Sequence, residues 1–440
     1  MTNSNRRNFI KSVSGVSLAA AMGMGISLRA GAAVKAKIVV VGGGYGGVIA
    51  AKYLKMAEPG LEVVLIEQNK RYVSCPLSNE VLAGLGNIEH LTFGYEGLAR
   101  RGITVVHDTV EAIDPQARKV MISGGKSFDY DRVIVSPGVD FKWGAIKGYD
   151  EEASQTIPHA WKAGPQTTLL ANQIKDMKDG GVVIITVPDN PFRCPPGPYE
   201  RAALIAHYLK QNKPRSKIIL LDAKDKFSKQ GLFLQGWTQH YGDIISESSK
   251  EKYGSMIEWV PASKGGEIDA INAATRTAMS VVGKEFKADV LNVIPPQHAG
   301  KIAHTTGLVN PKGWCPVDFK TFESTMHKNV HVIGDACVGG AMPKSGYAAN
   351  SQAKVAVAAI IASLRGVDPD EPAYLNACYS LITPEHGISV TAIYQVKDGQ
   401  LVEVPNSGGV SPIDVSPAFR KIEVAHAKSW LKNITTEMFG

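Results

Sequence analysis

The amino-acid sequence predicts an α/β protein with two Rossmann-like dinucleotide-binding-type domains and a smaller α+β domain at the C-terminus. A glycine-rich unit of strand, helix and strand occupies residues 37–67, and a second unit with the same order begins near Thr167. Residues 366–440 instead combine apolar strands, turns rich in proline and glycine, and one terminal helix. The length of 440 residues also exceeds that of one ordinary domain.

The first 32 residues are typical of a targeting segment rather than of a folded domain. Arg6 and Arg7 form a twin arginine, an apolar run rich in glycine and alanine follows over 13–28, and the Ala-Gly-Ala of 30–32 offers a small-residue cleavage site. We therefore expect a bacterial twin-arginine export signal and a periplasmic mature protein. An uncleaved membrane anchor is the alternative, but the run is short and rich in glycine for a spanning helix.

Charge and cysteine content exclude some classes of function. The formal charge is +7, but the targeting segment holds four basic residues and no acidic one, which leaves 44 basic against 41 acidic residues. Such a mild excess argues against nucleic-acid binding. No later stretch is long and apolar enough to span a bilayer. The five cysteines are widely spaced, without a C-x-x-C motif or a Cys/His cluster, so no zinc site is expected.

The first domain, placed at 33–150, opens with a strand, a helix and a second strand. Lys37–Val41 is a short apolar run that predicts a buried parallel strand, and Val48–Met56 is rich in helix-forming residues. Leu61–Ile66 is the second apolar run, and Glu67 stands at its end. This order is the β–α–β unit that binds dinucleotides, and Glu67 can accept hydrogen bonds from a ribose diol.

The glycines Gly42, Gly44 and Gly47 form the G-x-G-x-x-G of this unit. The first permits a tight turn, the second lets the backbone approach a pyrophosphate, and the third lets the helix pack closely on the strand. The free N–H groups and the dipole at the helix N-terminus favour the phosphates. The motif predicts a dinucleotide without distinguishing FAD from NAD.

A cysteine, Cys75, lies in the loop that follows Glu67. The loop continues from the strand that carries the ribose acid, so it stays near the nucleotide and can reach the far end of an extended FAD. This cysteine is either a small buried residue or a covalent tether, and its position alone favours the buried residue.

The second domain, placed at 151–286, lacks the glycine motif. Thr167–Met177 predicts a helix and Val182–Val187 a buried strand, but residues 188–198 then read PDNPFRCPPGP. Prolines have no N–H donor and cannot build a backbone that cradles phosphate. A nicotinamide nucleotide is therefore not expected here, and a cysteine loop replaces the nucleotide loop. Residues 226–242, rich in aromatic residues and Gln, suggest a loop or lid.

Two residues of this region are candidates for chemistry. Cys194 sits at a strand end, where open α/β sheets place ligands. Glu200 lies in the first turn of the following helix, where it can move protons or simply stabilise the helix N-terminus. The sequence by itself leaves both roles of Glu200 open.

Residues 287–365 are predicted to complete the first domain, with 288–296 as the strand that returns to it. An apolar strand ends in Gly334-Asp335, where Asp335 can accept from a ribityl hydroxyl while nearby N–H groups face phosphate. The early glycine motif and this late Gly-Asp pair bracket one FAD site. Lys344 could balance the charge of reduced flavin or pair with a surface acid. The segment that contains it also supplies two further candidate cofactor contacts, Gly346 and Tyr347.

The C-terminal domain, 366–440, contains the fifth cysteine, Cys378. An apolar strand over 387–394 and a terminal helix over 419–439 follow it. The apolar positions of that helix predict a face packed in the core rather than one that contacts a membrane.

These motifs resemble the flavoprotein subunit of flavocytochrome c sulfide dehydrogenase. The matching stretches extend over the whole mature chain: VVVGGGYGG, CPLSNE, FRCPPGPYERA, GWCPVDFKTFES, HVIGDA, MPKSGY, and NACYS followed by GISVTAIY. FRCPPGPYER and NACYS are the most specific. The resemblance implies a glutathione-reductase-like fold, FAD attached through a thioether to Cys75, a redox disulfide between Cys194 and Cys378 over the flavin, and a haem c partner subunit. Cys315 and Cys337 are then expected to be small packed residues, with Cys337 near the phosphates.

The resemblance also implies a function, the periplasmic oxidation of hydrosulfide to persulfide or sulfur with electrons passed through FAD to a cytochrome c haem. Glu200 would manage protons beside the disulfide. Two alternatives stay open: a sulfide:quinone oxidoreductase at a membrane surface, and a non-catalytic flavin module that docks a cytochrome. A pyridine-nucleotide disulfide reductase is disfavoured because the second glycine motif and a close cysteine pair are missing.

Overall fold

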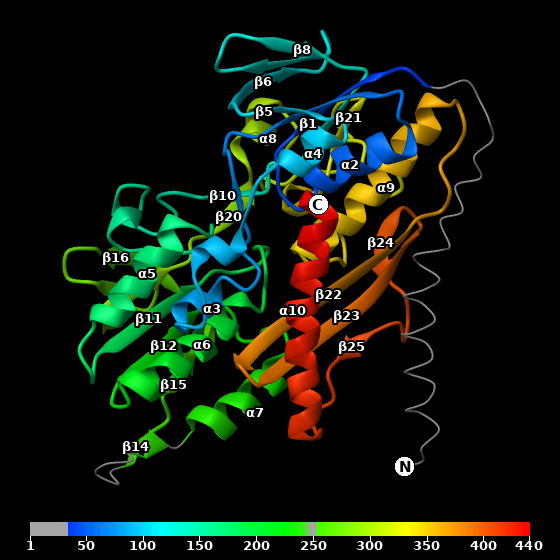
Figure 1. Ribbon diagram of the computed structural model, residues 1–440. Helices are drawn as coiled ribbons and strands as arrows, with labels where there is room; N and C mark the ends of the chain where they lie inside the picture. The colour runs from blue at the N-terminus through cyan, green and yellow to red at the C-terminus, as the bar shows by residue number, and fades with distance from the viewer. Residues whose placement is uncertain (1–33, 243, 246–251) are drawn as a thin grey trace. The chain divides into compact units, whose positions relative to one another are not determined.

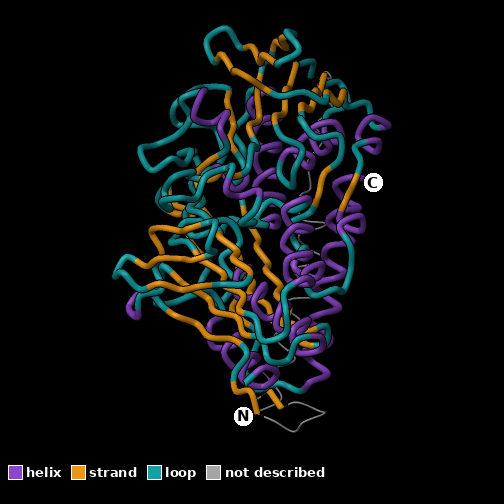
Figure 2. Tube along the Cα trace, turned by 90° about the vertical axis from the view of Figure 1, so that its left-hand side faces the viewer, coloured by secondary structure: helices purple, strands orange, loops and turns teal. Residues whose placement is uncertain are grey.

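The computed structural model describes residues 34–242, 244–245 and 252–440. The expected targeting segment lies outside these residues. The described chain is α/β, as predicted, and contains a parallel sheet of five strands and another of four (Figure 1). In the lower half of Figure 2 several strands run side by side on the left, and helices lie to their right. None of the helices in the described ranges is long and apolar enough to cross a membrane.

The first parallel sheet belongs to the glycine-rich unit. Its strand order is β21-β9-β1-β2-β5, and every neighbouring pair is parallel. The apolar runs are buried on both faces, which explains why they contain no alternation of polar residues. Helix α2, Gly47–Ala57, follows β1 directly. The five strands are β1 Lys37–Val41, β2 Glu62–Ile66, β5 Thr104–Val106, β9 Arg132–Val135 and β21 Val330–Val332.

The second parallel sheet has the order β15-β12-β11-β19. Helix α5, Pro165–Asp176, precedes it and α6, Gly197–Asn212, follows its strand β11. Tyr199 and Phe233 are among the large side chains fully buried in its core. The four strands are β11 Val182–Val187, β12 Lys217–Asp222, β15 Ile257–Val260 and β19 Val290–Val293.

Two expectations about this region are wrong. The strand expected to return to the first domain is β19, which pairs with β11 in the second sheet, with Val183 opposite Val290. A short apolar run fits either parallel sheet equally well, so its sequence does not identify its neighbour. The expected loop or lid at 226–242 is largely helix α7, Gln230–Tyr241, whose buried Phe233 and Trp237 lie one turn apart.

The C-terminal region builds a long hairpin, β22 Ala373–Thr383 with β23 His386–Lys397, extended by β24 Gln400–Glu403 and β25 Gly409–Val410. Helix α10, Pro417–Phe439, packs against β22 and β23, and its last turn lies beside α2 and α4, Glu96–Arg100 (Figure 1). Helix α9, Gly346–Leu364, packs against both α2 and β22. The hairpin is thereby held against the first sheet's helices.

The remaining strands and helices are short. The short strands pair as β3 with β4, β10 with β20, β13 with β14, β6-β7-β8 and β16-β17-β18. They are β3 Tyr72–Val73, β4 Thr92–Phe93, β6 Val110–Asp114, β7 Lys119–Ile122, β8 Ser127–Asp129, β10 Val139–Phe141, β13 Ile244–Ile245, β14 Lys252–Gly254, β16 Ile268–Asn272, β17 Thr277–Ser280, β18 Glu285–Lys287 and β20 Gln297–Ala299. The short helices are α3 Asn79–Leu82 and α8 Lys301–Thr305.

Candidate active site

A cavity of about 1030 Å³ opens where β1, β2, β9 and β21 end, the edge at which parallel sheets bind ligands. Seven of the ten predicted cofactor residues line it: Gly42, Gly44, Glu67, Cys75, Gly334, Asp335 and Gly346. Gly47, Lys344 and Tyr347 do not line it. The early and late motifs, far apart in the sequence, therefore border one cavity.

The three glycines of the motif have different surroundings. A Cβ on Gly47 would overlap the carbonyl oxygen of Gly42, so this glycine is needed for close packing of α2 on the turn. Gly42 itself has a φ of +100°, which favours glycine. A Cβ on Gly44 would meet only the Tyr72 ring, at 3.6 Å, which is an ordinary van der Waals contact. Gly44 therefore leaves room for a ligand.

Glu67 and Asp335, the two predicted acids on the cavity wall, differ in how their carboxylate oxygens are bonded. Glu67 accepts from the backbone N–H of Gly43 at 2.7 Å and of Asn69 at 2.9 Å, which fixes the carboxylate at the end of β2. Asp335 has a buried Oδ1 with no hydrogen-bond partner among the described residues, and burial raises its pKa. An orphaned buried acceptor on the cavity wall fits a hydroxyl of a bound dinucleotide such as FAD.

Cys75 lies on the wall of the same cavity. Its Sγ is 3.4 Å from the backbone nitrogen of Ala163, which donates to it, and 3.7 Å from the carbonyl oxygen of Trp161. The thiol is only partly buried and is free in the structure. These contacts place Cys75 between the first sheet and the segment that leads into α5.

The loop between β11 and α6 holds Cys194 against the segment that contains Lys344. The backbone nitrogen of Cys194 donates to the carbonyl oxygen of Lys344 at 2.8 Å, and that of Gly197 donates to the carbonyl oxygen of Cys194 at 2.8 Å. A Cβ on Gly197 would lie 3.1 Å from Cys194 Sγ and 2.7 Å from the Trp161 ring. The glycine at the start of α6 thus makes space for the sulfur.

Cys194 and Cys378 lie close enough for their charges to interact. Burial raises the pKa of the Cys194 thiol, and the nearby Cys378 and Glu200 raise it further. Burial also raises the pKa of Cys378. All five cysteines are free thiols in the structure, so the Cys194–Cys378 disulfide stays a prediction.

Glu200 connects the two cysteine-bearing elements. Its Oε1 accepts from the backbone N–H of Leu381 on β22 at 2.8 Å, and its Oε2 accepts from Nδ2 of Asn79 at 2.8 Å. The side chain is buried, and burial raises its pKa although both hydrogen bonds lower it. A buried carboxyl group with a raised pKa, next to two thiols, is suited to holding and releasing a proton.

Lys344 contacts the backbone of the segment that contains the late Gly334-Asp335 motif. Lys344 Nζ donates to the carbonyl oxygens of Asp335 at 2.8 Å and Cys337 at 2.6 Å and lies 3.8 Å from the centre of the Trp314 ring. No ion pair between described residues includes Lys344, so it is not the partner of a surface acid. Tyr347 stacks on Trp430 of α10, with ring centres 6.2 Å apart.

Cys315 and Cys337 lie side by side. The backbone N–H of Cys315 donates to the carbonyl oxygen of Ala336 at 3.0 Å, and that of Val338 donates to the carbonyl oxygen of Cys315 at 2.8 Å. Both side chains are buried, and burial raises their pKa values to about 12 and about 11. Cys337 follows the Gly-Asp-Ala segment, and its carbonyl oxygen accepts from Lys344.

Several residues of the site were not predicted from the sequence. Arg193 lines the cavity beside Cys75, and its guanidinium donates to the carbonyl oxygen of Trp161. Arg201 donates to Asn79 and to Asn292, which fixes the partner of Glu200. Each of the two arginines directly adjoins a residue that was singled out, so their place in FRCPPGPYER was the available signal.

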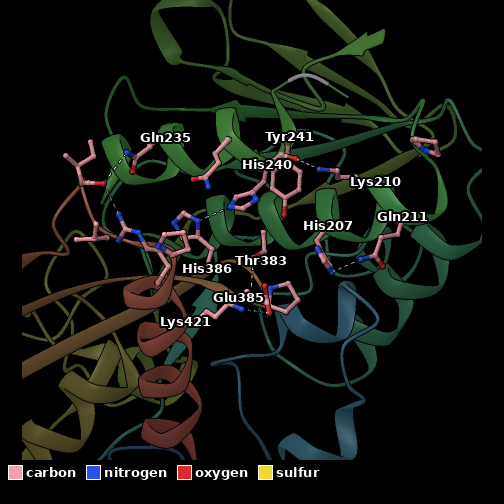
Figure 3. Close-up of a pocket in the computed structure, with 17 residues that line it drawn as sticks. His207, Lys210, Gln211, Gln235, His240, Tyr241, Thr383, Glu385, His386 and Lys421 are labelled. Carbon is pink, nitrogen blue, oxygen red and sulfur yellow. Dashed lines mark hydrogen bonds and ion pairs between the residues drawn. The ribbon is translucent and has the colours of Figure 1, made fainter. Parts of the chain in front are cut away.

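A second cavity, of about 920 Å³, lies between α6, α7, the β22–β23 turn and the start of α10 (Figure 3). Within it His240 Nε2 and His386 Nδ1 are 2.9 Å apart, and Lys421 pairs with Glu385 at 3.0 Å. None of the predicted site residues lines it. In the described part of the chain, no three His, Cys, Asp or Glu side chains are grouped so that they could hold a metal ion.

Comparison with protein families gives three matches that together extend over most of the chain. Residues 167–295 match the central domain of the sulfide dehydrogenase (flavocytochrome c) flavoprotein chain. Residues 370–439 match the flavin-binding domain of flavocytochrome c sulphide dehydrogenase. Residues 36–165 match the pyridine nucleotide-disulphide oxidoreductases. The second of these matches contains Cys378, and the first contains Cys194 and Glu200.

Individual relatives agree with these families. The flavoprotein chain of flavocytochrome c sulfide dehydrogenase from Chlorobaculum thiosulfatiphilum is 49% identical over 45 residues, which is 10% of this chain and 94% of that sequence. Mitochondrial sulfide:quinone oxidoreductase from Dictyostelium discoideum is 28% identical over 335 residues, 74% of this chain and 70% of the relative. The structure of sulfide:quinone oxidoreductase from Aquifex aeolicus has the same fold, with a TM-score of 0.67 at 16% identity over 91% of this chain and 92% of that one.

Proposed function

Because the chain belongs to the family of flavocytochrome c sulfide dehydrogenase flavoprotein chains, we propose that it oxidises sulfide with FAD and passes the electrons to a cytochrome c haem subunit. The observation that carries this proposal is the β11–α6 loop. In this loop Cys194 stands where a nucleotide-binding domain has its glycine-rich turn. Glu200, on the helix that follows, accepts a hydrogen bond from the strand that carries Cys378. Two further observations support the proposal: Cys378 raises the pKa of the Cys194 thiol, and Cys194 adjoins Arg193, which lines the cavity that fits FAD.

The substrate step uses the Cys194–Cys378 disulfide. Hydrosulfide attacks one sulfur of the disulfide, the bond between the two cysteines breaks, and a new sulfur–sulfur bond forms a persulfide. The other cysteine leaves as a thiolate and keeps the electron pair of the broken bond. Bound FAD supplies a two-electron acceptor that can release its electrons one at a time.

The residues of the chain bind the cofactor and control protons. The glycine turn leaves space at Gly44 for a pyrophosphate, and the orphaned oxygen of Asp335 would accept from a hydroxyl of the bound cofactor. Glu200 holds or releases the proton that accompanies formation of the thiol or persulfide. Arg193 and Ala163 line the side of the cavity next to Cys75.

The electron acceptor distinguishes this proposal from its main alternative. The similarity to sulfide:quinone oxidoreductases of several organisms favours a quinone as the second candidate. Sulfide is supplied anaerobically to the purified protein with either oxidised cytochrome c or a soluble ubiquinone analogue. We expect rapid reduction of the cytochrome and slow reduction of the quinone. Rapid quinone reduction without cytochrome reduction would assign the alternative.

Covalent attachment of FAD to Cys75 is part of the proposal, supported by the position of this thiol on the cavity wall. Acid precipitation of the wild-type protein should leave flavin absorbance in the pellet, whereas Cys75→Ser should release the flavin into the supernatant. The control is Cys315→Ala, which removes a buried thiol outside the cavity. Release of the flavin from the wild type would show that the link is absent.

The periplasmic location rests on the twin arginine and the small-residue site that follows it. In a bacterial host, the double substitution of Arg6→Lys and Arg7→Lys should retain the protein in the cytoplasm, because the export route requires both arginines. Fractionation followed by immunodetection measures the distribution. Unchanged export of the double variant would contradict a twin-arginine signal.

A further inference from the structure

Lys229 is a buried lysine without a carboxylate partner at contact distance among the described residues. It immediately precedes α7, and only 6% of the residue is exposed. The ion pairs in which both described side chains are buried are Lys224 with Asp222 and Arg420 with Glu423, and neither includes Lys229. A buried ammonium group costs free energy unless polar contacts or nearby anions compensate for it. The surroundings of Lys229 must therefore compensate for its buried charge.

The contacts of Lys229 hold its ammonium group against the strand that carries Cys378. Nζ donates to the carbonyl oxygen of Cys378 at 3.2 Å and to the hydroxyl of Ser380 at 2.8 Å. The Phe233 ring covers it, with the ring centre 5.8 Å from Nζ. The backbone of Lys229 has a φ of +59°, a left-handed conformation that costs a residue with a side chain free energy. The fold therefore holds Lys229 in this position despite an unfavourable backbone conformation.

The anionic and titratable groups around this ammonium come from every element packed against it. They are Cys378 on β22, Glu200 on α6, Cys194 in the β11–α6 loop and Glu423 on α10. Burial lowers the pKa of Lys229, and the attraction of these groups opposes that shift. In return, Lys229 opposes the rise that burial, Glu200 and Asp335 cause in the pKa of Cys378.

We propose that Lys229 is a positioning residue of the disulfide step, whose ammonium group stabilises the thiolate that Cys378 becomes when hydrosulfide attacks Cys194. The inference rests on the proposed function and assigns the two cysteines different roles. Hydrosulfide forms a sulfur–sulfur bond to Cys194, the Cys194–Cys378 bond breaks, and its electron pair leaves on the sulfur of Cys378. The proton of hydrosulfide stays on the persulfide. A leaving thiol with a lower pKa leaves faster, so a nearby cation speeds this step.

The first test measures the thiolate directly and needs no sulfide. Wild type, Lys229→Met and Lys229→Arg are reduced with dithiothreitol, alkylated with iodoacetamide over a range of pH, and the modified Cys378 is quantified by peptide mass spectrometry. Methionine keeps an unbranched side chain only one atom shorter than that of lysine and removes the charge. We expect the midpoint of Cys378 alkylation to rise by at least about one pH unit in Lys229→Met and to return towards the wild type in Lys229→Arg.

The matched control is Lys226→Met, which removes an exposed lysine three residues away and should leave the midpoint unchanged. If Lys229→Met does not fold, Ser380→Ala replaces it, because this variant removes one of the two Nζ contacts and should raise the midpoint by a smaller amount. An unchanged Cys378 midpoint in a folded Lys229→Met protein, or in Ser380→Ala where the first variant cannot be made, overturns the proposal.

The second test follows flavin reduction by sulfide in a stopped-flow experiment. Lys229→Met should be at least about tenfold slower than wild type, while its flavin content and its reduction by dithionite stay normal. An equal rate in the two proteins contradicts the role in the disulfide step. If sulfide fails to reduce even the wild-type flavin, the proposed function fails, and the alkylation midpoints still decide whether Lys229 stabilises the Cys378 thiolate.

Discussion

Two strand-to-helix connections at equivalent places in the two parallel sheets have been adapted to different tasks. The β1–α2 turn is rich in glycine, and the β11–α6 loop is rich in proline and contains Cys194. Both helices begin at a glycine. Gly47 lets two backbone segments touch, whereas Gly197 makes room for the sulfur of Cys194. The same position in the fold therefore serves a cofactor in one sheet and a reactive side chain in the other.

The supply of free backbone N–H groups explains the difference. In the second loop, prolines remove several donors, and those of Arg193, Cys194 and Gly197 are used within the protein. No phosphate cradle can form from such a backbone. The first loop keeps Gly44 open towards the cavity instead.

The largest effect expected from this comparison is that of Cys194→Ser. It should slow sulfide-dependent flavin reduction by about three orders of magnitude or more, because the disulfide can no longer form, while bound flavin stays at the wild-type level. Stopped-flow absorbance at the flavin band measures the rate. Cys315→Ala serves as the control and should keep the wild-type rate. A normal rate in Cys194→Ser would show that the second loop is not reactive.

A smaller effect is expected when Glu200 loses its charge. Glu200→Gln should reduce the rate of flavin reduction by about 100-fold, because a group that transfers protons is removed. Reduction of the variant by dithionite should be unaffected. A rate equal to that of the wild type would show that Glu200 does not transfer protons and acts only through its hydrogen bonds to Leu381 and Asn79.

The same substitution should change how stability depends on pH. Burial raises the pKa of Glu200 above its ordinary value of 4.5, so the folded protein holds this proton more tightly than the unfolded chain. The stabilisation is complete below pH 4.5 and is lost as pH rises through the folded-state pKa. Melting temperatures of wild type should therefore fall relative to Glu200→Gln as pH rises, and parallel curves would contradict the raised pKa.

The smallest effects separate the roles of two glycines in the first loop. Gly47→Ala should lower the free energy of unfolding by about 1–3 kcal/mol or more, because its Cβ would overlap the Gly42 carbonyl. Gly44→Ala should change the free energy of unfolding of the flavin-free protein by less than about 0.5 kcal/mol but reduce the flavin incorporated per chain. Denaturant titration and flavin absorbance measure the two quantities. Full flavin incorporation in Gly44→Ala would contradict a close approach of the cofactor to Gly44.

Much of the fold could be predicted from the sequence because parallel strands buried on both faces give unbroken apolar runs. The pairing of β19 with β11 could not be predicted, because an apolar run does not indicate which strand it pairs with. The aromatic content of residues 226–242 suggests a loop or lid, whereas the four-residue spacing of Phe233 and Trp237 is the signal that predicts helix α7.

The candidate site likewise contains residues that the sequence predicts and residues that it does not. Cys194 and Glu200 stand in a local motif, so the sequence identifies them as candidates. The contact of Lys229 with Cys378 joins residues 149 positions apart, and that of Asn79 with Glu200 joins residues 121 apart. Such pairs depend on how the C-terminal hairpin and α3 pack against α6, which no local pattern contains.

The central claim is that electrons from sulfide reach the flavin through the cysteines of the second loop and the C-terminal hairpin. The most direct measurement is an anaerobic titration of wild type and Cys194→Ser with sulfide, followed at the flavin band without any electron acceptor. The account predicts full bleaching of the wild-type flavin and none of the variant on the same timescale. Bleaching of both proteins, or of neither, would contradict it.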